Sequence, residues 1–255
     1  MKSKKVMKIN DLIVETHVGL ERQGPGSCEA TLRALSFVDG LNKNSRVMDL
    51  GCGTGGQAMV IAQNITAGEI IGLDIFPDFI EVFNANAKKL NLQDRVKGLV
   101  GSMDDLSFAK EGFDLIWSEG AIDEIGFEKG LNYWNNYLKK DGFVAVTSAS
   151  WFTDERPAEV EKFWTAAGCR LNTIVRNISI MQNAGYKLVA VFPLSENCWT
   201  DNYFVPRTAA EKEIAEKHPS NKTVEDYIKD SKYEVELYSK YNRYYGYVFY
   251  IGKKI

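Results

Sequence analysis

The feature that most constrains the fold of this 255-residue chain is the stretch VMDLGCGTGG at residues 47–56. A short apolar run followed by closely spaced glycines predicts a strand that turns sharply into a helix and brings its backbone close to a ligand at the helix N-terminus. Two ligand fingerprints fit the loop. Gly51, Gly53 and Gly56 match the dinucleotide pattern G-x-G-x-x-G, whereas Gly51, Gly53 and Gly55 match acidic-x-G-x-G-x-G. The glycines alone therefore leave open whether the loop binds a pyrophosphate or an amino-acid sulfonium.

The acid before the loop favours the second pattern. Asp49 ends the strand two residues before Gly51, and a carboxylate there repels a pyrophosphate but suits an ammonium or sulfonium, directly or through water. Asp74 ends the next expected strand, 23 positions after Gly51, and is placed to accept hydrogen bonds from the two hydroxyls of a ribose. The alternative role for Asp74 is to cap the helix that opens at Pro77.

The rest of the chain has the pattern of an α/β protein. From residue 46, short β-branched runs alternate with amphipathic segments, which predicts a Rossmann-like, doubly wound sheet. Strands are expected at 46–50, 69–74, 94–100, 113–118, 143–148, 186–192 and 245–252. Helices are expected at 54–65, from 77 onward, and at 130–140, 156–167, 172–184, 209–217 and 224–241. The Asp141-Gly142 pair is expected to end the helix at 130–140.

Two parts of the chain fall outside this sheet. Residues 1–45 are expected to form an N-terminal helical lid, and residues 46–255 the main domain, with helical insertions around 151–168 and 195–243. Segments attached to the carboxyl ends of parallel strands lie where open α/β sheets bind ligands. The lid and the insertions are therefore expected to wall the site.

Composition excludes several classes of function. The formal net charge is −3, so the chain lacks the positive field of a nucleic-acid-binding protein. It has no apolar run of membrane length, and no signal-peptide core follows the basic start MKSKKVMKIN. The four cysteines are scattered, without metal-binding or disulfide spacing. We expect a cytoplasmic protein with reduced thiols, no metal, no membrane span and no nucleic-acid partner.

Five ordered motifs resemble those of the class I S-adenosylmethionine-dependent methyltransferases, and especially the small-molecule branch that includes ubiquinone/menaquinone-biosynthesis enzymes. The resemblance covers roughly residues 46 to 150. The motifs are VMDLGCGTGG (47–56), IGLDIFPDFI (71–80), GSMDDLSF (101–108), FDLIWSEGAI (113–122) and YLKKDGFVAV (137–146). The resemblance implies a seven-stranded sheet whose last, antiparallel strand lies beside the fifth. It also implies S-adenosyl-L-methionine as cofactor and methyl transfer to a small-molecule acceptor by in-line displacement.

The same resemblance assigns cofactor-binding roles to individual residues. The methionine end is assigned to Asp49 and the loop residues Gly51, Cys52, Gly53 and Gly55. The ribose is assigned to Asp74, and the adenine to Ile75 with Ser102 and Met103. Relatives often have Asp-Ala where this chain has Ser102-Met103, so the adenine amino group is expected to meet Asp104 or the serine hydroxyl. Ser118 ends the fourth strand beside the cofactor.

Candidates for the chemistry are fewer. Glu119 follows the fourth strand beneath the expected methyl group, and His17 lies in the segment THVGLERQGPGS that is expected to fold over the cofactor. Both are candidate catalytic residues, since an acceptor that must lose a proton needs a base within hydrogen-bond reach. Glu124 is instead assigned to a solvated helix start. The Asn/Asp-Pro-Pro-Tyr motif of enzymes that methylate planar nitrogens is absent at 118–120, which disfavours DNA-adenine or glutamine methylation.

Two rival functions remain. The first is a non-catalytic protein of the same fold that binds S-adenosylmethionine or another protein. The second is an NAD-dependent oxidoreductase, which would need a neutral residue at position 49. The assembly is expected to be a monomer or a homodimer, and the acceptor cannot be inferred because the variable insertions select it.

Overall fold

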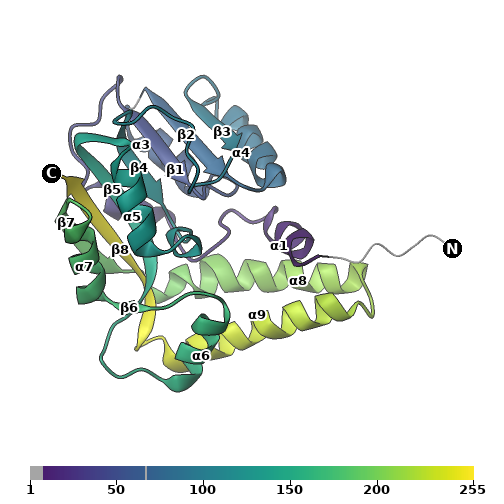
Figure 1. Ribbon diagram of the computed structural model, residues 1–255. Coiled ribbons are helices and arrows are strands. Elements are labelled where there is room, and N and C mark those ends of the chain that lie inside the picture. The colour runs from purple at the N-terminus through teal and green to yellow at the C-terminus, as the bar shows by residue number, and fades with distance from the viewer. Residues whose placement is uncertain (1–7, 67) are drawn as a thin grey trace.

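The computed structural model describes residues 8–66 and 68–255 (Figure 1). Residues 1–7, the start of the expected lid, lie outside the described part. The strands are β1 (Arg46–Leu50), β2 (Glu69–Asp74), β3 (Val96–Val100), β4 (Phe113–Ser118), β5 (Leu138–Trp151), β6 (Asn172–Thr173), β7 (Tyr186–Pro193) and β8 (Tyr245–Lys254). Their order is β3-β2-β1-β4-β5-β8-β7, with β6 attached to the end of β5. The predicted doubly wound sheet is confirmed, and its last strand runs antiparallel beside β5 as expected.

Strand β1 lies in the interior of the sheet between two parallel neighbours. Asp49 is in register with Gly72 of β2 and with Trp117 of β4. The carboxyl ends of these three strands therefore lie side by side. In an open parallel sheet, such an edge is where ligands bind.

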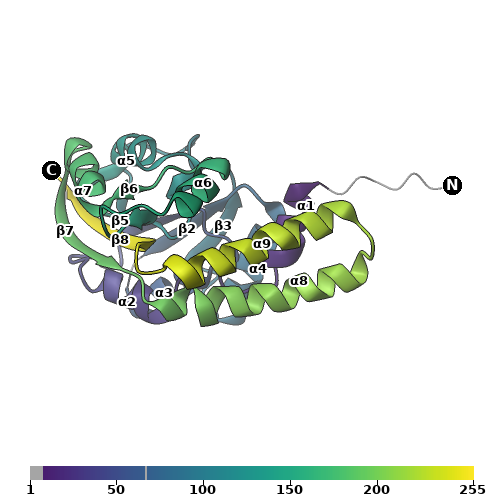
Figure 2. The same ribbon diagram turned by 90° about the horizontal axis from the view of Figure 1, so that it is seen from below.

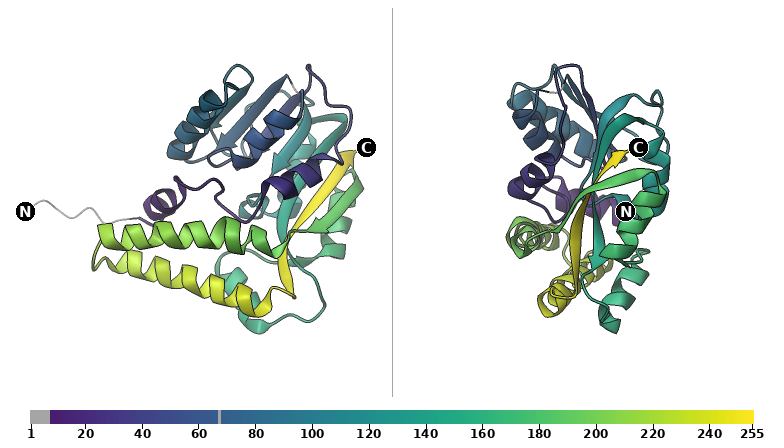
Figure 3. Two further views of the ribbon diagram at one scale, coloured as in Figure 1. Left: turned by 180° about the vertical axis from the view of Figure 1, so that it is seen from behind. Right: turned by 90° about the vertical axis from the view of Figure 1, so that its left-hand side faces the viewer.

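Helices cover both faces of the sheet (Figures 1 and 3). The helices are α1 (Ile9–His17), α2 (Cys28–Leu35), α3 (Gly56–Asn64), α4 (Pro77–Lys89), α5 (Phe127–Asn135), α6 (Ala158–Ala166), α7 (Ile174–Asn183), α8 (Val205–Lys217) and α9 (Lys222–Tyr241). Alternate residues of β1 point to opposite faces: Val47 packs in the core with α2, α3 and α4, and Met48 packs in the core with α5 and α7. This alternation is the period of two that a strand buried on both faces requires.

A helical layer lies beyond the carboxyl edge of the sheet. Helices α8 and α9 form a long antiparallel hairpin, and α1 packs against it (Figure 2). Leu12 of α1 is buried against Ile214 of α8 and Val224 of α9. No helix in residues 8–66 or 68–255 is both long and apolar enough to cross a membrane.

The prediction for the segment before β5 was wrong. The helix ends at Asn135 and not at 140, and β5 begins at Leu138. Asp141 has a φ of 63° and interrupts the pairing of β5 with β4, in which Phe113 pairs with Leu138 but Leu115 pairs with Phe143. The Asp-Gly pair thus forms a bulge within β5. The same left-handed backbone conformation is common at helix ends, which explains the error.

Candidate functional site

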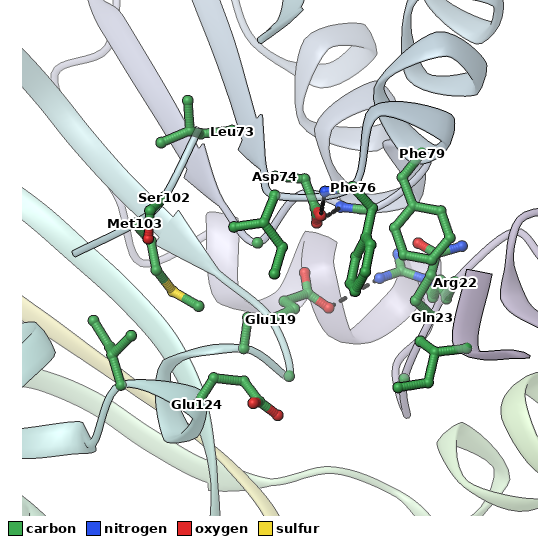
Figure 4. A pocket seen from close by; sticks show the side chains of 18 of the residues that line it. Arg22, Gln23, Leu73, Asp74, Phe76, Phe79, Ser102, Met103, Glu119 and Glu124 are labelled. Carbon is green, nitrogen blue, oxygen red and sulfur yellow. Dashed lines mark hydrogen bonds and ion pairs between the residues drawn. The ribbon is translucent and has the colours of Figure 1, made fainter. Parts of the chain in front are cut away.

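A cavity of about 520 Å³ opens at the carboxyl ends of β1, β2 and β4 (Figure 4). Its walls come from the N-terminal segment, from the glycine loop, and from the loops after β2, β3 and β4. The lining residues are Asn10, Ile13, Arg22, Gln23, Gly24, Pro25, Gly51, Gly53, Gln57, Leu73, Asp74, Ile75, Phe76, Phe79, Gly101, Ser102, Met103, Asp104, Glu119, Gly120, Ala121, Glu124 and Ile125.

The glycine loop has the backbone that its sequence predicted. Gly51, Gly53 and Gly55 have φ values of 71°, 52° and 90°, which residues with a side chain rarely adopt. Gly51 and Gly53 line the cavity. Gly55 is not among the lining residues, and a Cβ on it would lie 2.7 Å from the ring of Phe83 of α4. Cys52 is fully buried and also does not line the cavity.

Asp74 organises the loop from the end of β2. Its carboxylate accepts a hydrogen bond from the backbone N–H of Gly53 at 2.9 Å and another from that of Phe76 at 3.0 Å. Burial raises the pKa of Asp74, and these two amides oppose the shift. The N-cap of α4 is Phe76, so Asp74 does not cap the helix. Each carboxylate oxygen accepts one backbone hydrogen bond. Because Asp74 also lines the cavity, each oxygen can accept a second hydrogen bond from a ligand there.

Asp49 lies behind the cavity wall. Its side chain is fully buried, and burial raises its pKa well above the usual range. Gln57, which lines the cavity, donates to Oδ1 of Asp49 at 3.3 Å, whereas Oδ2 has no hydrogen-bond partner within the described residues. We expected Asp49 to face the ligand, but the structure places Gln57 at the surface of the cavity. The reason is its register, which turns Asp49 toward the α3 side together with Val47.

The residues assigned to adenine all line the cavity. Ile75 lines the cavity with 57% of its surface exposed, an unusual position for a large apolar side chain. Ser102, Met103 and Asp104 line the same cavity. The Ser102 hydroxyl donates to Asp104 at 2.6 Å, and Lys129 donates to the other oxygen of Asp104 at 3.0 Å. These hydrogen bonds lower the pKa of Asp104 and hold it as a carboxylate that can accept from an amino group.

Glu119 is already engaged by the protein. Oε1 accepts from the Thr31 hydroxyl at 2.7 Å and from the Trp117 indole N–H at 2.9 Å. Oε2 forms an ion pair with Arg22 at 2.9 Å, and only 6% of the Arg22 side chain and 4% of the Glu119 side chain are exposed. These contacts hold the Glu119 side chain in one position. This candidate catalytic residue therefore lines the cavity with both carboxylate oxygens already hydrogen-bonded.

Gln23 attaches the N-terminal segment to the glycine loop. Its side chain accepts from the Thr54 N–H at 2.9 Å and donates to the Thr54 hydroxyl at 2.9 Å. A Cβ on Gly53 would lie 1.9 Å from the Gln23 side-chain oxygen. The sequence interpretation did not single out Arg22, Gln23 or Gln57. Their position in the sequence could have indicated them, because Arg22 and Gln23 directly precede Gly24-Pro25-Gly26 and Gln57 directly follows the glycine loop.

Two further residues predicted for the site do not line this cavity. His17 does not line this cavity; its ring contacts the carbonyl of Ile13 at 2.9 Å and the hydroxyl of Tyr203 at 3.3 Å. Burial lowers its pKa to about 4. Ser118 is buried and donates to the carbonyl of Leu50 at 2.8 Å.

Glu124 was assigned to a solvated helix start; it is exposed, as predicted, and it also lines the cavity (Figure 4). It belongs to the 3₁₀ turn η1 (Ile122–Glu124) that follows β4. Its neighbour Asp123 accepts from the Ser148 hydroxyl and from the Ala149 N–H, and burial raises the pKa of Asp123 to about 6. The Glu124 carboxylate has no hydrogen bond or ion pair within the described residues; only its backbone N–H is paired, with the carbonyl of Ala121 at 3.0 Å. Four carboxylates line the cavity, those of Asp74, Asp104, Glu119 and Glu124. Among the described residues, only the carboxylate of Glu124 has no hydrogen-bond partner.

The fold, the glycine loop and the acid at the end of β2 define the class I methyltransferase architecture. The methyltransferase domain model matches residues 41–201, more than half of the chain. The chain therefore belongs to this methyltransferase family.

Curated relatives include methyltransferases of small molecules and of ribosomal protein L11. The chain is 31% identical over 113 residues to the ubiquinone/menaquinone biosynthesis C-methyltransferase of Citrifermentans bemidjiense, covering 44% of this chain and 48% of that one. It spans about half or less of the length of the first curated relatives it matches.

Solved structures agree on the fold. Geranyl diphosphate C-methyltransferase from Streptomyces coelicolor, crystallised with Mg²⁺, geranyl diphosphate and S-adenosyl-L-homocysteine, has a TM-score of 0.66 at 15% identity, over 88% of this chain and 78% of that one. The [4+2]-cyclase SpnF has a TM-score of 0.73 at 19% identity, over 89% of this chain and 81% of that one. Identities this low establish the fold alone. In residues 8–66 and 68–255, no group of three His, Cys, Asp or Glu side chains is arranged to hold a metal.

Proposed function

We propose that this protein transfers a methyl group from S-adenosylmethionine to a small organic acceptor. The observation that carries the proposal is the joint position of Asp74, Gly51 and Gly53 at one cavity, with the buried, half-paired carboxylate of Asp49 behind it. A pyrophosphate is disfavoured because the nearest fixed charges are negative. A ligand with a cationic amino-acid end and a ribose is complementary to this arrangement.

The residues fit that cofactor in kind and in number. Gly51 and Gly53 leave room for close backbone approach, since a Cβ on Gly51 would lie 2.3 Å from that of Ala121. Asp74 retains acceptor capacity for ribose hydroxyls. Asp49 would attract the amino-acid ammonium through Gln57 or a water. When bound, S-adenosylmethionine supplies a methyl group that is activated by the positive sulfonium.

The lining residues then have two tasks. The Arg22–Glu119 pair and Gln23 hold the N-terminal segment over the glycine loop, which limits water at the cofactor and orients the reactants. Glu124 is proposed to face the acceptor, either to orient a cationic group or to accept a proton from a hydroxyl or carbon acid. We do not assign a proton transfer to His17, because its ring lies outside this cavity.

The rival within the same fold is a protein that binds the cofactor without transferring the methyl group. The fold does not decide between them, since one structural neighbour with it is described as a [4+2]-cyclase. The cytoplasmic location, the absence of a nucleic-acid partner and the monomeric or homodimeric state stay predictions from the sequence. So does the division into a lid at residues 1–45 and a main domain at 46–255.

The test is a turnover experiment. Purified protein is incubated with S-adenosylmethionine and sets of small amines, phenols, hydroxy acids and carbon acids, and S-adenosylhomocysteine release is followed. Methyl transfer predicts release that depends on one acceptor class, with a product 14 mass units heavier per methyl group. If the protein binds the cofactor but no acceptor set increases the release of S-adenosylhomocysteine, the proposal is contradicted and the non-catalytic rival is favoured.

A further inference from the structure

A second cavity, of about 540 Å³, lies in the helical layer. It is enclosed by the end of α1, by α6 and by the α8–α9 hairpin, whose two helices run side by side in Figure 2. It shares no lining residue with the cavity at the carboxyl edge of the sheet. Its size is in the range of cavities that bind small molecules.

The floor of this second cavity is a buried ionic network. Arg207 is 3% exposed and forms ion pairs with Glu234 at 2.6 Å and with Glu211 at 3.3 Å. It also donates to the Tyr203 hydroxyl at 3.1 Å. Taking three charges out of water is costly, so such a network needs a reason beyond stability. Glu211 lies outside the lining, but three carboxylates line the cavity against the two cations Lys162 and Arg207, so the lining is more negative than positive.

The walls add aromatic rings and unpaired carboxylate oxygens. The rings are those of Phe163, Tyr203, Tyr227 and Tyr233. Glu234 uses only Oε2 in its contact with Arg207. Asp230, within α9, lines the cavity, and its carboxylate has no hydrogen bond or ion pair to the described residues. Rings combined with acceptor oxygens and excess negative charge are complementary to an organic cation.

The cationic residues of the lining do not reverse this preference. Arg207 is neutralised by its two carboxylates. Lys162 lies on α6 and is exposed. His17 is neutral near pH 7, because burial lowers its pKa to about 4. None of the three provides a free, buried positive charge that would favour an anion.

We propose that the second cavity binds a small organic cation, with an ammonium head held between the aromatic rings and the carboxylates of Asp230 and Glu234. The proposal is independent of methyl transfer at the first cavity. It concerns a separate site, because no residue is common to the two linings.

The experiment is calorimetric titration of the full chain with choline and with 3,3-dimethyl-1-butanol, which has the same shape without the charge. We expect choline to bind at least about tenfold more tightly, since both the cation–π and the carboxylate attraction need the charge. Equal affinities, or no choline binding, would overturn the proposal.

Variants locate the site. Asp230→Asn and Tyr233→Leu change exposed residues, so the fold is expected to survive, and unfolding midpoints check this. Each should weaken choline binding severalfold. Lys162→Gln removes a repelling charge and should leave binding unchanged or tighter, whereas an anion site would lose affinity. Asp74→Asn should leave choline binding unchanged. A loss with Asp74→Asn would place choline in the first cavity and contradict the proposal, whatever the outcome of methyl-transfer assays.

Discussion

Arg22 and Glu119 are 97 residues apart in the chain and form an ion pair of 2.9 Å that is almost fully buried. Arg22 belongs to the segment between α1 and α2, and Glu119 follows β4. The pair therefore fastens the N-terminal segment to the sheet beside the candidate cofactor cavity. Thr31 of α2 contacts both side chains, accepting from Arg22 at 3.0 Å and donating to Glu119 at 2.7 Å.

Neutralising Glu119 should cost much more stability than neutralising an exposed partner. Glu119→Gln leaves the buried Arg22 charge uncompensated, which is expected to lower the free energy of unfolding by about 3 kcal/mol. The matched control is Glu69→Gln, which breaks a half-exposed pair with Arg46 and should cost about 1 kcal/mol or less. Urea unfolding measures both. Equal losses would show that the buried pair does not fasten the segment.

Gly53→Ala should disrupt the cofactor site. An added Cβ would lie 1.9 Å from the Gln23 oxygen, and alanine at a φ of 52° is strained. We expect S-adenosylhomocysteine affinity to fall at least about tenfold and stability to fall by about 2–4 kcal/mol. Gly40→Ala is the control, because Gly40 has a φ of 76° with open space around it. It should lose about 1 kcal/mol of stability and no affinity. Similar affinities in both variants would refute the steric account.

Glu124→Gln should affect the acceptor and not the cofactor. The Glu124 carboxylate lines the cavity without a hydrogen-bond partner among the described residues, so its substitution breaks no side-chain contact among them and should leave the S-adenosylhomocysteine affinity unchanged. Once an acceptor is found, kcat/KM should fall about 10²-fold or more if the carboxylate takes a proton. Glu128→Gln, an exposed change in the first turn of α5, is the control. Wild-type kcat/KM in the Glu124 variant would remove this residue from the proposed mechanism.

His17 should make the protein sensitive to mild acid. Its pKa is about 4 in the folded protein, below the usual 6.5, because burial disfavours the imidazolium. Between pH 6.5 and 4 the unfolded chain binds more protons, so the free energy of unfolding falls as the pH is lowered, by up to about 3 kcal/mol for this residue.

The variant His17→Gln keeps a polar group but does not titrate. Urea unfolding at several pH values between 7.5 and 4.5 should show the wild type losing more stability than the variant over this window. Parallel curves would mean that His17 is accessible enough to be protonated without cost.

The sequence predicted the sheet because its signals are local. Alternation between strands and helices and the glycines of residues 51–56 depend on short segments, and the structure confirms them. Asp141-Gly142 was misplaced because the same left-handed turn serves a helix end and a strand bulge. Only the pairing of β5 with β4, a long-range contact, distinguishes the two.

The candidate site was predicted unevenly for the same reason. Asp74 could be found because it ends a strand at a fixed distance from the loop. The engagement of Glu119 by Arg22 and Thr31 depends on how the N-terminal segment packs on the sheet, and no local pattern contains that information. The turn η1, which brings Glu124 to the cavity wall and turns Asp123 inward, is equally invisible in sequence.

The central claim is that the first cavity binds S-adenosylmethionine through Asp74 and the glycine loop. The most direct test is calorimetric titration of the protein with S-adenosylhomocysteine and with NADH, repeated for Asp74→Asn and for the exposed control Asp78→Asn. We predict binding of the adenosyl compound alone, weakened by about 1.5–3 kcal/mol in Asp74→Asn and unchanged in Asp78→Asn. Binding of NADH alone, or an S-adenosylhomocysteine affinity that Asp74→Asn does not change, would contradict it.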